Sequence, residues 1–243
     1  MIPKVIHYCW FGGKPIPEKD KKYIESWKKF CPDFEIKEWN ENNYNIEKNK
    51  YMSDAYKEKK WGFVPDYARF DIIYKEGGFY LDTDVELIKS LEELRENEAY
   101  MGFESERWIN GGIGFGAEAG NELIKELRDM YENINFYNED GSLNIKPSPY
   151  YITEFLEKKG LKCNNKMQLI DTMRIYPTEY FAAKDYISGK VTKTKNTISI
   201  HQYNASWQSP KAKFKLKVKR IIGEKIYNLL ILIKKKIKTN NKI

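Results

Sequence analysis

Two aspartates separated by a single residue are the clearest candidates for chemistry in this sequence. In the stretch FYLDTDVE, residues 79–86, an apolar run ends in Asp82, Thr83 and Asp84. If the run is a β-strand, residues i and i+2 face the same side, so the two carboxylates would lie a few ångströms apart. Such a pair of like charges is unfavourable unless one acid keeps its proton or a cation lies between them.

Three interpretations of the pair predict different chemistry. The first is a solvated loop in which the two acids have no role. The second is a glycosidase pair, in which one carboxyl donates a proton and the other attacks or activates water. This pair must flank the bond from opposite sides, which neighbours on one strand do poorly. The third is a site for Mn²⁺ or Mg²⁺, where close carboxylates hold the cation and leave positions open for diphosphate oxygens.

The segment before the pair favours the cation site. Asp66 and Arg69 lie three residues apart in VPDYARFDIIYKEGG, where Pro65 suits the first turn of a helix and Gly77 suits its end. They would share a helix face and could point into one pocket. The carboxylate could accept hydrogen bonds from sugar hydroxyls, and the guanidinium could stabilise a phosphate or a departing oxygen. A surface ion pair with little effect is the alternative.

The rest of the chain alternates between strand-like and helix-like segments. Strands are expected at residues 4–12, 34–40, 79–84, 99–104, 111–118, 167–177 and 197–207, and helices at 17–30, 53–59, 64–76, 119–134 and 149–160. This order predicts an α/β fold with a mainly parallel central sheet. Ligands bind at the carboxyl ends of such strands, which is where the aspartate pair falls.

Charge is distributed unevenly along the chain. Residues 211–243 contain twelve Lys or Arg against the single acid Glu224, a net charge of +11. Because the whole chain carries +7, residues 1–210 carry −4. We therefore expect a catalytic or binding domain at 1–210 and a separate basic tail at 211–243.

The tail predicts contact with an anionic surface. Its residues KAKFKLKVKRIIGEKIYNLLILIKKKIK mix lysines and apolar side chains at helical spacing, which indicates a basic amphipathic helix lying on an anionic membrane surface. A helix docked on the body with its lysines in solvent is the alternative. Nucleic acid is not expected as a partner, because the tail has few aromatic side chains for stacking.

Compartment is indicated by what the sequence lacks. The three cysteines have no metal-type spacing, which fits a reducing environment, and the N-terminal apolar run resembles a strand rather than a secretory signal. The longest apolar stretch, LLILI at 229–233, is far shorter than the roughly 20 residues of a spanning helix. We expect a cytoplasmic protein, peripheral on the inner face of the plasma membrane.

Three motifs in order carry a family resemblance. The pattern V-x-D-Y-A-R-x-D-I-x-Y-x-x-G-G-x-Y-L-D-T-D-V-E at 64–86 resembles the signature of the DXD-containing sugar-binding glycosyltransferases of family 32. The opening IPKVIHYCW resembles the first strand of that family, and IHQYNASW at 200–207 resembles its closing element. The family includes fungal mannosyltransferases and bacterial polysaccharide enzymes.

The resemblance implies a GT-A fold that binds a nucleotide sugar and Mn²⁺ or Mg²⁺. It places the catalytic positions at Asp66, Arg69, Asp82 and Asp84, the donor-binding positions at Trp10, Tyr80, Asn110, Ser206 and Trp207, and the metal ligands at Asp84, Asp82 and His201.

Individual roles follow from the same resemblance. Trp10 would stack on uracil, and Tyr80 would lie near the ribose or diphosphate. Asp84 would bind the metal directly, while Asp82 would bridge through ribose or water. Ser206 and Trp207 would cap the diphosphate.

The implied activity is metal-dependent, retaining transfer of a sugar, expected from a UDP-sugar, to a hydroxyl of a glycan or lipid-linked oligosaccharide. The expected setting is synthesis of a bacterial surface polysaccharide, such as a capsule. The alternative function is a catalytically inactive scaffold that binds a sugar nucleotide or a glycan.

Overall fold

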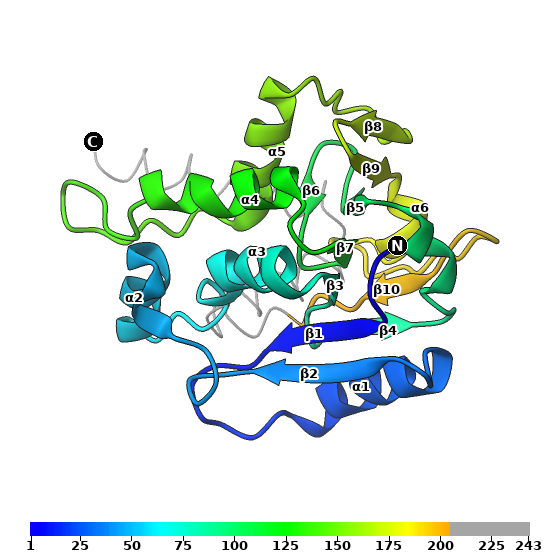
Figure 1. The fold of residues 1–243 in the computed structure, drawn as a ribbon, viewed down its shortest axis with the longest axis horizontal. Coiled ribbons are helices and arrows are strands. Elements are labelled where there is room, and N and C mark those ends of the chain that lie inside the picture. The colour runs from blue at the N-terminus through cyan, green and yellow to red at the C-terminus, as the bar shows by residue number, and fades with distance from the viewer. Residues whose placement is uncertain (205–243) are drawn as a thin grey trace, which may run out of the picture.

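A computed structural model describes residues 1–204 of the chain. Figure 1 shows a central twisted sheet with helices on both faces. The α-helices are α1 (Glu18–Phe30), α2 (Lys50–Lys57), α3 (Pro65–Glu76), α4 (Glu122–Asp129), α5 (Ser148–Lys158) and α6 (Thr178–Phe181). Short 3₁₀ turns lie at Ile46–Lys48, Glu92–Glu96 and Met130–Asn133.

The strands form one large sheet and one small one. They are β1 (Val5–Cys9), β2 (Glu35–Trp39), β3 (Gly78–Tyr80), β4 (Val85–Leu87), β5 (Ala99–Phe103), β6 (Ile109–Asn110), β7 (Phe115–Ala117), β8 (Gln168–Ile170), β9 (Met173–Tyr176) and β10 (Ser199–His201). In the large sheet the order is β2-β1-β3-β7-β5-β9-β8, with β6 paired to β5, and β10 pairs with β4 in the small sheet.

Most strands of the large sheet run the same way. β2, β1 and β3 are parallel neighbours, and β5 and β9 share their direction, whereas β7, β6 and β8 run against them. The predicted α/β class with a mainly parallel central sheet is confirmed. The antiparallel β7 in the middle of the sheet was not predicted.

The aspartate pair lies in a turn and not on a strand. β3 ends at Tyr80, four residues before the end of the strand predicted at 79–84. The backbone N–H of Val85 donates to the carbonyl of Asp82 at 3.0 Å, so the chain bends at this point before β4 begins. The strand ends early because the amide of Asp82 donates to the carbonyl of Gly112 instead of continuing the β1 ladder.

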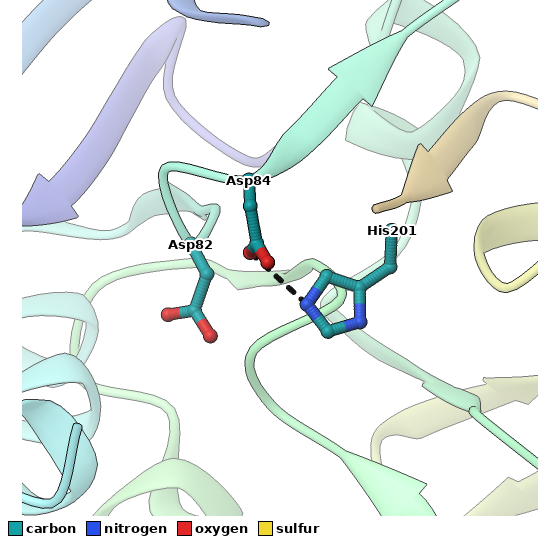
Figure 2. Close-up of side chains that lie close together, drawn as sticks. All are labelled: Asp82, Asp84 and His201. Carbon is teal, nitrogen blue, oxygen red and sulfur yellow. Dashed lines mark hydrogen bonds and ion pairs between the residues drawn. The ribbon is translucent and has the colours of Figure 1, made fainter. Parts of the chain in front are cut away.

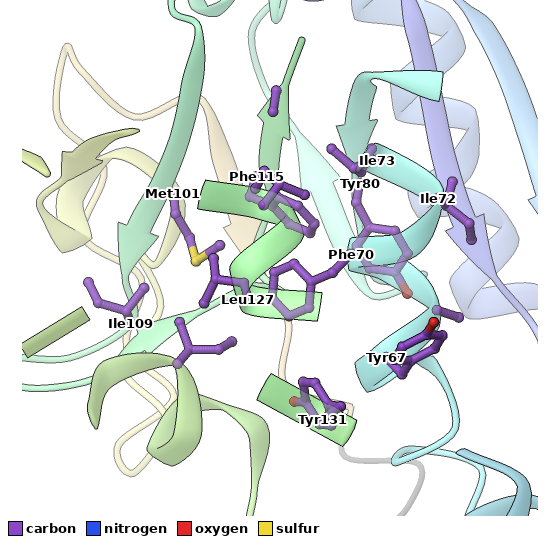
Figure 3. Close-up of a cluster of buried hydrophobic side chains, with 14 of the residues drawn as sticks. Tyr67, Phe70, Ile72, Ile73, Tyr80, Met101, Ile109, Phe115, Leu127 and Tyr131 are labelled. Carbon is purple, nitrogen blue, oxygen red and sulfur yellow. The ribbon is translucent and has the colours of Figure 1, made fainter. Parts of the chain in front are cut away.

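Two apolar clusters lie on opposite faces of the large sheet. Ala99, Met101 and Phe103 of β5 belong to the cluster beneath α2, α3 and α4, while Tyr100, between Ala99 and Met101, belongs to the cluster beneath α1. This is the alternation expected of a strand buried on both faces. Figure 3 shows the first cluster, in which Phe70 of α3 packs on Phe115 of β7 with ring centroids 5.1 Å apart.

α3 positions polar residues inside the molecule. Every residue from Pro65 to Ile73 is buried, including Asp66 and Arg69 in its first turns. The helix ends at Gly77, which has φ +66° and whose added Cβ would lie 2.8 Å from the backbone nitrogen of Ala119. Only glycine fits that end, so the direction in which the chain enters β3 is fixed.

No helix among residues 1–204 combines the length and the apolar character needed to cross a bilayer. The basic tail at 211–243, predicted to be an amphipathic helix, and the domain boundary at 210 lie outside the described residues.

Candidate active site

A cleft of about 1590 Å³ opens at the carboxyl ends of β1, β3 and β5. Trp10 follows β1, Asp82 follows β3 and Glu104 follows β5, and all three line the cleft. Asp66 and Arg69 reach it from α3. Because strands of one direction bring these ends together, residues far apart in the chain meet at a single edge of the sheet.

Asp84 is hydrogen-bonded by residues of the last described strand and of the segment after it. His201 on β10 pairs in register with Val85 on β4, which brings its imidazole Nε2 to 3.1 Å from Oδ1 of Asp84. The backbone N–H of Asn204 donates to the other carboxylate oxygen at 2.8 Å. Figure 2 shows Asp82 beside this pair, with its carboxylate directed toward the same space.

The three side chains are suited to holding a divalent cation. One donor atom from each of Asp82, Asp84 and His201 lies within 4.8 Å of the other two. Carboxylate oxygens are preferred by Mg²⁺ and Mn²⁺, and an imidazole nitrogen is also accepted by Mn²⁺. The donor set therefore fits the expected metal.

Charge states at this cluster are compatible with ligation. Burial alone would raise the pKa of Asp84, but His201 and the N–H of Asn204 hold that pKa below its usual value. Burial also raises the pKa of Asp82, against the opposing effect of Arg69, and Asp84 adds to the rise. Two close carboxylates of this kind are relieved by a cation between them.

A buried ion network joins α3 to the aspartate pair. Nη2 of Arg69 lies 3.2 Å from Oδ1 of Asp66 and 3.5 Å from Oδ1 of Asp82, and its Nε donates to the carbonyl of Pro65 at 3.2 Å. Arg69 and Asp66 are each 3% exposed. The predicted shared pocket for these residues is therefore what the structure shows, and the pair is not an ordinary surface ion pair.

The protonation of Asp66 depends on this network. Burial raises the pKa of Asp66 to about 6, although Arg69 opposes the rise, and the hydroxyl of Tyr51 donates to Oδ2 at 3.3 Å. Burial would lower the pKa of Arg69, but Asp82 and the other nearby groups hold it above its ordinary value. Arg69 therefore stays cationic in the site.

Asn110 is fixed at both ends of its amide. Its Nδ2 donates to Oε2 of Glu104 and its Oδ1 accepts from the N–H of Gly112, each at 2.6 Å. A Cβ on Gly112 would lie 2.2 Å from Oδ2 of Asp82, so a larger residue there would displace the carboxylate. The segment from Asn110 to Gly112 therefore helps to fix the position of the Asp82 carboxylate.

Trp10 lies at the expected place. It follows directly after β1, its indole Nε1 donates to the carbonyl of Lys14 at 2.5 Å, and its half-buried ring lines the cleft. The ring is anchored at one edge and is available to a flat ligand within the cleft.

Comparison with known families identifies the kind of protein. Residues 17–101 match the model described as the glycosyltransferase sugar-binding region containing a DXD motif. That range includes Asp66, Arg69, Asp82 and Asp84.

Residues 17–101 thus resemble the sugar-binding region of the DXD glycosyltransferases. An uncharacterised glycosyltransferase of Acanthamoeba polyphaga mimivirus is 26% identical over 76% of this chain and 77% of its own length. Inositol phosphoceramide mannosyltransferase 3 of Schizosaccharomyces pombe is 28% identical over 53% of this chain but only 37% of its own length.

A solved glycosyltransferase involved in glycosylation of the major capsid of PBCV-1 aligns with 84% of this chain and 95% of its own, at 11% identity and a TM-score of 0.48. The family match and the glycosyltransferase relatives together indicate an enzyme rather than the binding scaffold considered from the sequence.

Tyr80, expected from the sequence to bind the donor, lies in the core beside Arg69. Tyr80 is fully buried and does not line the cleft, and its expected place near the ribose or diphosphate stays a prediction. The guanidinium of Arg69 lies 5.1 Å from the centroid of its ring. Tyr80 therefore supports Arg69 from the core side.

Ser206 and Trp207, predicted to cap the diphosphate, lie outside the described residues. Three other residues of this glycosyltransferase were missed from the sequence. Glu104 holds Asn110, Asn204 binds Asp84, and Asp20 on α1 accepts from Nδ2 of Asn204 at 2.6 Å. Asn204 lies within IHQYNASW, but its contacts with Asp84 and Asp20 join segments that are distant in the chain. Glu104 acts within one loop, through an Asn110 contact that the local sequence does not mark.

Proposed function

We propose that this glycosyltransferase moves a sugar from a UDP-sugar to a hydroxyl of a glycan or lipid-linked oligosaccharide, with Mn²⁺ or Mg²⁺ and with retention at the anomeric carbon. The observation that carries the proposal is the convergence of Asp82, Asp84 and His201 on one point of a cleft that Arg69 also reaches. A bound cation would supply charge neutralisation for the donor diphosphate.

Different residues would contact different parts of the donor. Trp10 offers an aromatic face for the base at one strand end. Asp82, Asp84 and His201 would hold the cation. Arg69, fixed by Asp66 and Pro65, presents a preorganised cation to the leaving group, which is the kind of stabilisation that counts most when charge develops in the transition state.

The proposed transfer keeps donor and acceptor on one face of the sugar. The oxygen of the acceptor hydroxyl bonds to the anomeric carbon, the bond from that carbon to the phosphate oxygen breaks, and its electron pair stays on the diphosphate. The acceptor proton passes to that diphosphate oxygen. Asp66 is engaged by Arg69 and Tyr51, which supports departure and attack on the same face over a covalent intermediate on Asp66.

Release of nucleotide diphosphate from a panel of UDP- and GDP-sugars tests this function. We expect slow hydrolysis of a UDP-sugar in water that requires Mn²⁺ or Mg²⁺ and stops with chelator. NMR of the released sugar at early times should show the donor's anomeric configuration. Hydrolysis unaffected by chelator, inverted product, or a preference for GDP-sugars would contradict the respective part of the proposal.

The setting proposed for the reaction is the cytoplasmic face of a bacterial plasma membrane, in surface polysaccharide synthesis. The charge of residues 211–243, twelve Lys or Arg against one Glu, supports attachment to anionic lipid. Flotation with vesicles of anionic and of neutral lipid tests this. The full chain should float only with anionic vesicles, and a chain lacking 211–243 should not float; equal flotation of both forms would refute the attachment.

A further inference from the structure

Two aromatic side chains line the cleft beside the site without a role in the proposed donor binding. Trp108, in the loop between β5 and β6, and Tyr150, in the first turn of α5, have ring centroids 5.8 Å apart and ring planes inclined by 36°. Both rings line the cleft and both are half-buried. An aromatic pair that stays partly open inside a cleft can receive an apolar face of a ligand.

The pair is held rigidly. The N–H of Glu104 donates to the carbonyl of Trp108 at 2.8 Å, which closes the loop between β5 and β6. The N–H of Ile109 donates to Oγ1 of the fully buried Thr153 on α5 at 2.9 Å. Because this bond ties β6 to α5, the two rings come from elements that are fixed to each other, and a ligand would not have to order them.

Cations steady the two rings. The guanidinium of Arg107 lies 5.0 Å from the centroid of the Trp108 ring, and Nζ of Lys146 lies 4.0 Å from that of Tyr150. Neither cation lines the cleft, although both rings do. The cations therefore support the rings and leave the cleft-facing surfaces to a ligand.

The polar groups beside the rings link them to the reaction centre. Glu104 lines the cleft next to Trp108 and is bonded to Asn110, whose partner Gly112 abuts Asp82. Burial raises the pKa of Glu104, against the opposing effect of Asn110. A sugar presents an apolar C–H face and a rim of hydroxyls, and this part of the cleft offers both an aromatic face and hydrogen-bonding oxygens.

The size of the cleft leaves room for a second substrate. Its volume of about 1590 Å³ exceeds the roughly 300–1,000 Å³ of ordinary small-molecule pockets. A transferase must hold a donor and an acceptor together, and the donor is assigned to the part of the cleft between Trp10 and Asp82.

We propose that Trp108 and Tyr150 form the platform on which a sugar ring of the acceptor stacks. The inference deepens the proposed function, and rests on it, by assigning the subsite in which a sugar ring of the acceptor lies. Glu104 lies within this subsite as an acceptor of hydrogen bonds from sugar hydroxyls.

Saturation-transfer NMR with methyl glycosides of common hexoses tests the platform in the full chain with UDP and Mn²⁺ present. We expect transfer to the ring protons of at least one glycoside with the wild type and with Tyr150→Phe. Trp108→Ala and Tyr150→Ala should weaken apparent glycoside affinity by about tenfold or more. Persistence of the same signals in both alanine variants, or no transfer to any glycoside with the wild type, would overturn the proposal.

Hydrolysis of the UDP-sugar by water, measured in the same variants, distinguishes failure of the platform from failure of the proposed function. Both alanine variants should hydrolyse donor within about twofold of the wild type, since neither ring is assigned to the donor. A parallel fall in donor hydrolysis and in glycoside binding would mean that the rings are structural, which would also overturn the platform. Absence of hydrolysis in the wild type would count against the proposed function, whereas glycoside binding can still be read.

Discussion

Nε2 of His201 lies 3.1 Å from Oδ1 of Asp84, although the two residues are 117 positions apart in the chain. The contact depends on the pairing of β10 with β4, since His201 stands opposite Val85. The candidate metal site is therefore completed by the last described strand, and it forms only when β10 pairs with β4.

Gly112 tests how closely the loop behind Asp82 sets the site. Gly112→Ala would place a Cβ 2.2 Å from Oδ2 of Asp82, so the carboxylate must move. We expect metal-dependent UDP release to fall by about tenfold or more, as when a group supporting a metal ligand is displaced. Gly111→Ala is the matched control, because its Cβ would meet nothing nearer than 3.5 Å. Equal activity in the two variants would mean that the position of Asp82 is not critical.

Arg69 tests the assignment of charge to the leaving group. In Arg69→Lys a single ammonium cannot keep the contacts to Asp66, Asp82 and Pro65 together. Turnover should fall by about 10²–10³-fold with little change in thermal stability. Arg69→Ala should in addition lower the free energy of unfolding by about 3–5 kcal/mol, because two carboxylates lose their partner. If the Arg69→Lys variant turns over within a few-fold of the wild type, Arg69 does not stabilise the leaving group. Urea unfolding of Arg69→Ala measures the predicted loss of stability.

Trp10 tests the nature of the donor. Removing the indole in Trp10→Ala should raise KM for the UDP-sugar by about tenfold, since stacking of a base on an aromatic side chain contributes about 1–3 kcal/mol. Trp10→Phe keeps a flat ring and should lose less. If KM is unchanged in the alanine variant while turnover falls, the ring supports the fold and does not bind the base.

His7 predicts a pH dependence of stability that is independent of catalysis. Its Nδ1 accepts from the indole N–H of Trp39 at 3.0 Å, and Nε2 lies 3.0 Å from the carbonyl of Gly77, so the neutral ring fits with its proton on Nε2. Burial lowers the pKa of His7 to about 4, outweighing Glu76, which raises it. Protonation would place two N–H donors against each other at Trp39.

The sign of this effect follows from proton binding. Between about pH 6.5 and 4 the unfolded chain binds a proton at His7 that the folded chain does not, so this stability contribution is complete above pH 6.5 and is lost as the pH falls toward 4. The loss should be about 3 kcal/mol. Urea unfolding of the wild type and His7→Gln across this range measures the difference. Parallel curves for the two proteins would refute a buried neutral His7.

Sequence reasoning was most successful where spacing within one element decides the outcome. Asp66 and Arg69 share a face because they are three residues apart on a helix whose first turn and end are marked by Pro65 and Gly77. The position of the aspartate pair at a strand end followed from the apolar run before it. The strand itself was predicted too long, since the bond from Asp82 to the distant Gly112 is invisible in local sequence.

Long-range pairing limited the rest. β7 is three residues long and lies among glycines, so its sequence has no period that shows it running against its neighbours. The burial of Tyr80 depends on which face of β3 meets α3, and its place beneath Arg69 required the packed helix. Asn204 reaches Asp84 and Asp20 only because the chain returns to β4 and α1.

Binding of Mn²⁺ in the presence of UDP, followed by electron paramagnetic resonance, tests the central claim most directly. The wild type should bind the ion with UDP, and Asp84→Asn, which removes a ligand charge, should weaken binding by about 100-fold or more. Asp33→Asn, which removes an exposed carboxylate outside the cleft, should bind as the wild type does. Equal Mn²⁺ affinity of Asp84→Asn and the wild type would contradict the account.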